Sequence, residues 1–253
     1  MKFDFLPNEV AAYLLILARV GALVMLLPGL GEENVSPRFR LTIAVMLAFV
    51  FWPFARQFYV VDAANPVRLI GMAISEVAVG LALGLVGRFV MSALSVAGNV
   101  IANQLGLGFV MTVDPTQGQQ SAIVGTFMSL VGVAMIFATD LHHLAIGAIA
   151  ASYDAFRPGD FPATGDAAKL AIDAVTAAFR IGVQLSAPFL VFGLVFNLGL
   201  GVLSKLMPQL QVFFVAAPLT LIVGFALFAL VIGVLMSVFL SSVGDTLRML
   251  SGG

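Results

Sequence analysis

Long apolar runs separated by short polar stretches make up most of this chain. A helix needs about 20 mostly apolar residues to cross the hydrocarbon core of a bilayer. The apolar runs that reach or approach this length cover residues 10–27, 41–54, 69–102, 121–138, 142–151, 181–204 and 209–244. The pattern predicts an all-α, polytopic membrane protein with about six or seven long helical segments.

Prolines and glycines mark where these helices are expected to end. Pro28-Gly29 closes the first run, because proline removes a backbone donor and glycine frees the backbone. Residues 31–40 and 153–165 are expected to be polar loops, and residues 204–208 a turn. Pro218 leaves two interpretations of the last run, as one long helix or as a broken one.

The character of the chain changes near residue 166. Lys169 and Asp173 are four residues apart and Arg180 follows seven further on, so the three side chains share roughly one side of a helix. Beyond Arg180 the helix carries no charge up to Ser204. This change divides the chain into residues 1–165 and residues 166–253.

Composition supports a membrane protein and excludes several functions. Of 253 residues, 61% are apolar and 10% are charged, and the mean hydropathy is +1.09, whereas soluble domains have about 25% charged residues. The net charge of −1 offers no basic field for nucleic acid. The absence of cysteine excludes a disulfide framework, a thiolate metal site and a cysteine nucleophile. The amino-terminal residues lack the basic region of a signal peptide, so we expect the first apolar segment to be kept.

Three ionisable side chains, Arg19, Glu76 and Arg88, fall inside apolar runs. Such groups are costly in a membrane and indicate either a structural pair or a functional site. Glu76 and Arg88 lie about 120° apart around a helix, so we do not expect them to pair with each other. Pairing with another helix or subunit is favoured over a proton or ion relay, which would need several acids along one path. The uncharged residues expected in intramembrane polar or structural roles are Asn103, Gln104 and Asn197.

We find no enzyme motif in the sequence, and we predict no catalytic residue, no cofactor and no metal site. The two histidines, His142 and His143, follow Asp140. Adjacent helical side chains point about 100° apart, so the two imidazoles are not expected to ligate one ion readily. An interfacial or capping role is favoured for them. Gly106-Leu107-Gly108 lacks the Lys and the Ser or Thr of a phosphate-binding loop.

The most distinctive local feature is a glycine-rich segment, residues 104–120, between two membrane-grade helices. Its candidate gating residues are Gly106, Gly108, Phe109, Met111, Asp114 and Pro115. Irregular backbone at membrane depth is tolerated only where it is buried in protein or lines a cavity. A bulky ring and a deformable thioether are suited to closing an opening. Physical reasoning alone supports equally a surface loop in which Asp114-Pro115 begins a turn.

Three motifs, in order and at matching spacing, resemble the FliR family of flagellar export-apparatus membrane proteins over nearly the whole chain. The first comprises Arg19-Val20-Gly21, Leu27-Pro28-Gly29-Leu30-Gly31 and Val35-Ser36-Pro37-Arg38-Phe39-Arg40-Leu41. The second comprises Gly106-Leu107-Gly108-Phe109 with Asp114-Pro115. The third comprises Phe196-Asn197-Leu198-Gly199-Leu200-Gly201-Val202-Leu203, then Pro208-Gln209-Leu210-Gln211-Val212-Phe213 and Pro218-Leu219-Thr220.

The resemblance implies a protein of the bacterial inner membrane and the flagellar basal body. It implies assembly with FliP-like and FliQ-like subunits, beside other export-apparatus membrane proteins, into a hetero-oligomeric gate for unfolded flagellar substrates. Residues 1–165 would be the FliP-like part, with a channel plug in the segment 104–120, and residues 166–253 a FliQ-like helical hairpin. The plug would use Gly106, Gly108, Phe109 and Met111.

Other functions stay open at this point. The virulence counterparts of the family, in injectisomes, usually carry a lysine where this chain has Thr220, which favours the flagellar branch. A small-solute transporter or channel is a second possibility, with Glu76 and Asn103 at its site, although a transporter is expected to show related halves or paired broken helices. A purely structural scaffold is a third.

Overall fold

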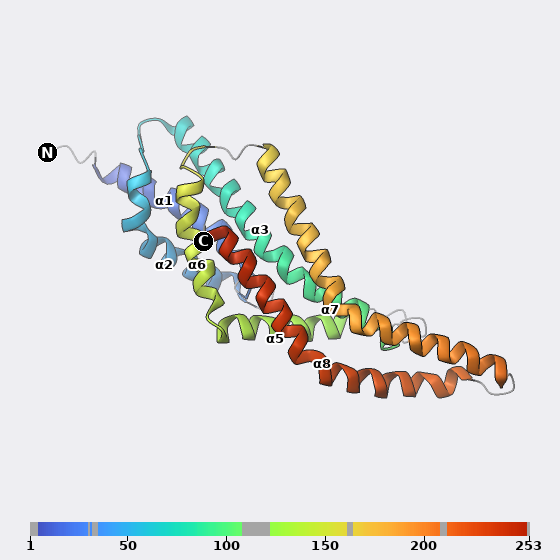
Figure 1. Ribbon diagram of the computed structural model, residues 1–253. Helices are drawn as coiled ribbons and strands as arrows, with labels where there is room; N and C mark the ends of the chain where they lie inside the picture. Colours follow the sequence, from blue (N-terminus) through green and yellow to red (C-terminus); the bar gives the residue numbers. More distant parts are fainter. Residues whose placement is uncertain are drawn as a thin grey trace. The chain divides into compact units, whose positions relative to one another are not determined.

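The computed structural model describes residues 5–29, 31, 35–107, 122–160, 164–207 and 212–251, and within these residues the regular elements are all helices. Figure 1 shows them along the chain. They are α1 (Phe5–Val24), α2 (Pro37–Ala55), the short 3-10 helix η1 (Arg56–Phe58), α3 (Pro66–Gln104), α5 (Ala122–Ala138), α6 (Leu141–Ala155), α7 (Thr164–Leu206) and α8 (Val212–Ser251). Five of the described helices are long and apolar enough to cross a membrane, or six if α5 and α6 together form one span. The predicted all-α membrane fold is confirmed.

Local capping explains where the observed helices differ from the expected ones. The predicted polar loop at 31–40 is too long, because α2 already begins at Pro37. Ser36 caps this helix by accepting a hydrogen bond from the Phe39 amide at 3.3 Å, and Pro37 occupies the first helical position, where its missing N–H has no cost. The run at 69–102 is a single helix, as predicted, and extends from Pro66 to Gln104.

The last apolar run forms one continuous helix. Pro218 lies inside α8, which continues from Val212 to Ser251, so the helix is not broken there. A break does occur between α5 and α6, where Asp140 adopts the left-handed conformation with φ 58°. A non-glycine residue in that region ends a helix, since the next turn cannot continue in register.

The chain forms two compact units. Unit 1 consists of Met1–Val90, Ile136–Thr176 and Val243–Gly253, and unit 2 of Met91–Met135 and Ala177–Ser242. The helices α3, α5, α7 and α8 therefore contribute segments to both units. The predicted division at residue 165 concerns likeness to two other proteins, and it stays a prediction.

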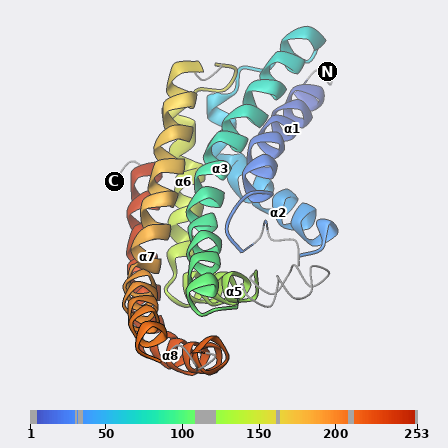
Figure 2. The same ribbon diagram turned by 90° about the vertical axis from the view of Figure 1, so that its right-hand side faces the viewer.

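In unit 1, α1 and α3 run in the same direction with their backbones close together (Figure 2). A Cβ atom on Gly80 would overlap the Arg19 carbonyl oxygen, and one on Gly84 would lie 2.7 Å from the Leu26 side chain. Contacts of this kind need glycine, and in membranes they replace the missing hydrophobic drive for helix association. They bring the middle of α3 onto the carboxyl-terminal part of α1.

In unit 2, α3 crosses α5 at two glycines, and α7 and α8 form an antiparallel hairpin (Figure 1). A Cβ atom on Gly98 would overlap the Gly125 backbone. In the hairpin, the rings of Phe189 and Phe228 lie 6.0 Å apart, and Phe192 lies beside Gly224. The residue numbers of these two contacts rise along α7 and fall along α8, so the two helices are antiparallel.

Candidate functional site: a buried ion-pair cluster

The most deeply buried ion pair among the described residues lies in unit 1, where α1 and α3 bring Arg19 and Glu76 together. Both side chains are 0% exposed, and Arg19 Nε lies 2.5 Å from Glu76 Oε2. Arg19 Nη2 donates a second hydrogen bond to Glu76 Oε1 at 3.2 Å, so the pair is bidentate. Two charges removed from water in this way must be paired with good geometry, since either one alone would carry a large desolvation cost.

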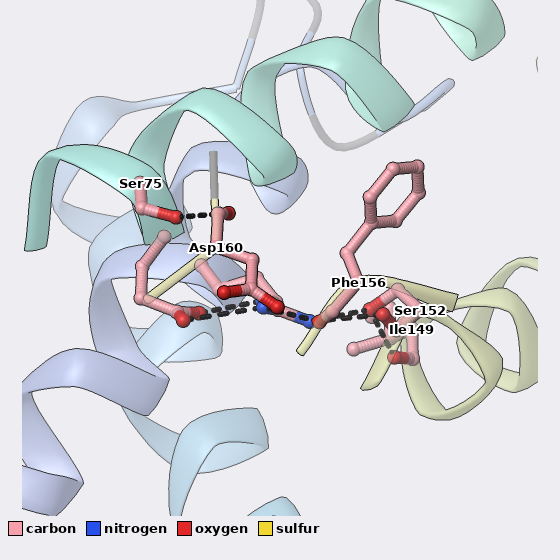
Figure 3. A network of polar contacts seen from close by, with 7 residues as sticks. Ser75, Ile149, Ser152, Phe156 and Asp160 are labelled. Atoms are coloured by element: carbon pink, nitrogen blue, oxygen red, sulfur yellow. Dashed lines mark hydrogen bonds and ion pairs between the residues drawn. The ribbon is translucent and has the colours of Figure 1, made fainter. Parts of the chain in front are cut away.

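The guanidinium also binds the carboxyl end of α6 (Figure 3). Arg19 Nη1 donates to the Ser152 carbonyl at 3.0 Å and to Ser152 Oγ at 3.4 Å, and Nη2 donates to the Phe156 carbonyl at 3.0 Å. A guanidinium has five N–H donors, and these contacts together with Glu76 give each of them an acceptor. The last carbonyls of a helix have no partner within it and favour a nearby positive charge. Arg19 therefore joins three helices, α1, α3 and α6.

Aromatic rings enclose this ion pair. The Arg19 guanidinium carbon lies 4.3 Å from the centre of the Tyr153 ring, a cation–π contact. Phe58 stacks on Tyr153 at 5.9 Å, and Tyr59 contacts it edge-on at 6.2 Å. The Tyr59 and Tyr153 hydroxyls are buried and have no hydrogen-bond partner among the described residues. Burial raises the pKa of Tyr59, because the phenolate would lose its hydration.

A turn after α6 extends the polar network toward a cavity. Ser75, next to Glu76, donates from its hydroxyl to the Asp160 carbonyl at 2.6 Å (Figure 3). Beside this contact lies a cavity of about 470 Å³. Its lining includes Phe58, Val60, Arg68, Met72, Gly159 and Asp160. The cluster thus fixes the turn 156–160 against α1 and α3.

Of the intramembrane ionisable residues predicted from sequence, the structure brings Arg19 and Glu76 together and leaves Arg88 exposed on α3. Ser152, Tyr153 and the Phe156 carbonyl were not predicted as partners of Arg19. A backbone carbonyl has no sequence signature, and more than 130 residues separate these groups from Arg19. The loop expected at 153–165 also placed Tyr153 outside a helix, whereas α6 extends to Ala155.

Two of the three polar residues predicted in unit 2, Gln104 and Asn197, contact the same residue of α7, Gly193. Gln104 is half-buried and its side-chain amide packs directly on Gly193, where no Cβ atom would fit. Asn197 Nδ2 donates to the Gly193 carbonyl at 2.8 Å. Asn103 is exposed at the end of α3.

Gly106 ends α3 in a Schellman motif. The Leu107 amide donates to the Ala102 carbonyl at 3.0 Å and the Gly106 amide to the Asn103 carbonyl at 3.1 Å, with Gly106 at φ 80°. This left-handed position favours glycine. The remaining candidate gating residues lie outside the described residues; they are Gly108, Phe109, Met111, Asp114 and Pro115.

The two histidines differ from the sequence prediction. Their side chains were expected to diverge, but the ring centres of His142 and His143 lie 4.2 Å apart. Both belong to the first turn of α6, directly after the left-handed Asp140, and their rotamers bring the rings together. The expected divergence of the two side chains is therefore wrong, and the absence of a metal site stays a prediction.

Comparison with known proteins gives consistent matches along most of the chain. The sequence profile of the family described as bacterial export proteins, family 1, matches residues 10–246. The flagellar biosynthetic protein FliR of Caulobacter vibrioides is 42% identical over 216 residues, which cover 85% of this chain and 86% of the relative. FliR of Bacillus subtilis is 30% identical over 221 residues, with coverage of 85% and 83%. The Yop proteins translocation protein T of Yersinia pestis is 27% identical over 224 residues, with coverage of 87% and 85%.

Proposed function

The chain belongs to the bacterial export proteins, family 1, and we propose that it forms part of the channel of the flagellar export gate together with FliP-like and FliQ-like subunits. It is a multi-pass inner-membrane component of a flagellar type III protein export apparatus, which consists of several proteins. Two of the flagellar relatives, at 42% and 30% identity, are more similar to this chain than the injectisome relative, at 27%.

The observation that carries the proposal is the length of the exposed apolar surface on α7 and α8. From Val212 to Gly244, α8 has no charged residue, a length of about 50 Å at 1.5 Å per residue. The hydrocarbon core of a bilayer is only about 30 Å thick. The apolar surface is therefore longer than an upright span requires, and this supports the shielding of part of it by other protein subunits.

The exposed side chains lie in stripes along the hairpin. On α7 they recur at the spacing of one helix face and are each 61–63% exposed; they are Val191, Leu194, Val195, Leu198 and Val202. On α8 a second stripe includes Ile222, Leu230 and Val234, and Leu230 is 80% exposed. Apolar residues at this spacing favour packing against a neighbouring helix. This supports residues 166–253 as a FliQ-like hairpin that packs among FliP-like and FliQ-like subunits, with residues 1–165 as the FliP-like part.

The contacts of Leu105 and Gly106, at the start of the segment 104–120, support a gating role for this segment. Leu105 is fully buried and packs on Gly224 of α8, and Gly106 faces the Thr220 methyl group of the same helix. The segment thus leaves α3 from an anchored position beside the hairpin. We infer that its residues 108–115 narrow the channel at rest, because apolar side chains in a constriction exclude water and ions. Unfolded export substrates displace it.

A membrane-leak measurement tests the gating role. Deletion of residues 108–111 leaves the Gly106 cap and the Leu105 anchor in place, and we expect the assembled complex to become permeable to ions. Phe109→Ala should increase the leak more than Leu107→Ala, since the former removes a ring from the constriction and the latter a side chain at the root. Unchanged permeability in the deletion variant would remove the gating role.

Co-purification tests the assembly. Leu198→Asp places a charge in the exposed stripe of α7 and should lower the yield of the complex with FliP-like and FliQ-like subunits. Val67→Asp is the matched control: Val67 is 79% exposed, and an acidic residue in the first turn of α3 is favourable there. A chain that purifies as a functional monomer or simple dimer would instead support a small-solute transporter.

A further inference from the structure

We propose that Asp140, His142 and His143 form a binding site for a divalent transition-metal ion of the zinc class, at the turn between α5 and α6. One ligand atom from each side chain lies within 4.8 Å of the others. Ligand atoms around a tetrahedral zinc ion are about 3.4 Å apart, as follows from bonds of about 2.0–2.1 Å. Small side-chain rotations therefore bring the three atoms onto one ion.

The environment of His142 points independently to a ligand. Its Nδ1 atom is shielded from solvent and has no hydrogen-bond partner among the described residues. The ring centres of Phe137 and His143 lie 5.2 Å and 4.2 Å from the ring centre of His142. A buried polar atom without a partner is rare and needs an explanation. Coordination of a cation would satisfy it.

The other two side chains are free to complete the site. Asp140 is the N-cap residue of α6, yet its side chain makes no capping hydrogen bond. Its Oδ1 atom instead lies 3.7 Å from His143 Nδ1, close to the separation of two ligands on one ion. The Asp140 and His143 side chains are 76% and 69% exposed. An ion can therefore enter from solvent and keep water in its remaining position.

The donor set defines the class of ion. Two imidazole nitrogens and one carboxylate oxygen suit zinc, cobalt, nickel or copper, whereas magnesium and calcium prefer sites made of oxygen. The chain has two histidines and no cysteine, so both of its imidazole donors lie at this turn. Leu141, between the ligands, packs near Gly244 of α8. A bound ion would thus fix the start of α6 beside the last turns of α8, within unit 1.

The test uses the full chain in detergent, purified without a histidine tag, stripped with a chelator and titrated with Zn²⁺. We expect one ion per chain and at least tenfold weaker binding in Asp140→Asn, His142→Gln and His143→Gln. Asp245→Asn is the matched control, because Asp245 and Arg248 form another exposed i,i+3 pair with the same 3.7 Å separation. This variant should bind Zn²⁺ like the wild type.

A spectroscopic measurement separates ligation from a loss of folding. Cu²⁺ bound to the wild type should show electron paramagnetic resonance coupling to two nitrogens, reduced to one in either histidine variant. Zn²⁺ should also protect both histidines of the unmodified chain from acylation, a result that needs no variant. Substoichiometric binding, unprotected histidines, or equal losses in Asp140→Asn and Asp245→Asn would overturn the site.

Discussion

Replacement of Glu76 by glutamine removes one charge of the buried cluster and leaves the other in place. The side chain keeps nearly the same shape and one oxygen that accepts from Arg19. The second contact becomes repulsive, because an amide N–H₂ group then faces a guanidinium N–H. Arg19 stays 0% exposed, so its charge has neither a counterion nor water.

The expected loss of stability depends on how deeply each ion pair is buried. Removing one partner of a buried ion pair costs about 3–5 kcal/mol. The pair of Arg56 with Glu9 offers a contrast within unit 1: it is also bidentate, at 2.8–3.0 Å, but its side chains are 33% and 17% exposed. Water screens such a pair, and Glu9→Gln should cost at most about 1 kcal/mol.

A double variant separates charge from hydrogen bonding. Arg19→Met with Glu76→Leu removes both charges together, and apolar replacement of a buried pair is often neutral. The Phe156 carbonyl then loses its donor, which lowers the free energy of unfolding by on the order of 1–3 kcal/mol. The Ser152 carbonyl keeps its bond from the Phe156 amide at 2.9 Å. The double variant should therefore be more stable than Glu76→Gln alone.

Trp52 provides the assay. It is the single tryptophan of the chain, lies in unit 1, and contacts the Tyr13 ring at 6.4 Å. Its fluorescence reports unfolding of the full chain in detergent. A loss of stability in Glu76→Gln no larger than in Glu9→Gln would contradict a buried, unscreened ion pair. So would a double variant as unstable as Glu76→Gln.

Three further changes test other parts of the structure. Gly98→Ala should destabilise the chain by about 1–3 kcal/mol, because the added Cβ atom would overlap the backbone of α5. Gly147→Ala is the control and should not destabilise it, since the space around Gly147 is open. Thermal unfolding followed by circular dichroism compares the two variants. Gly106→Ala should cost about 1–2 kcal/mol in the same assay, since φ is 80° there, and a neutral result would contradict the capping role. Above about pH 10, where unfolded tyrosine ionises, burial keeps Tyr59 protonated in the folded state. Stability should fall as pH rises there, and less so in Tyr59→Phe; parallel pH profiles would contradict this.

The sequence predicted the helices because long apolar runs have few alternatives in a membrane. It also predicted that Arg19 and Glu76 need partners, since a charge inside such a run is costly. It did not identify them as partners of each other, because the register between α1 and α3 depends on glycine contacts at Gly80 and Gly84 that no periodicity encodes.

The differences have local physical causes. The helix α2 begins earlier than predicted, because Ser36 caps it and Pro37 occupies its first position. The charged residues Arg38 and Arg40, which led to the prediction of a loop, lie in its first turn. The ring centres of His142 and His143 lie 4.2 Å apart although both residues belong to the helix α6. Helical periodicity gives the direction of the Cα–Cβ bond, whereas the side-chain rotamer decides where an imidazole ring lies.

The central claim is that protein subunits, rather than lipid alone, cover the apolar stripes of the α7–α8 hairpin. Site-specific photo-crosslinking tests it directly, with a photoreactive amino acid at Leu198 on α7 or at Leu230 on α8, 63% and 80% exposed respectively. We expect adducts with FliP-like or FliQ-like subunits from both positions in the native membrane. Lipid adducts alone from both positions would contradict it.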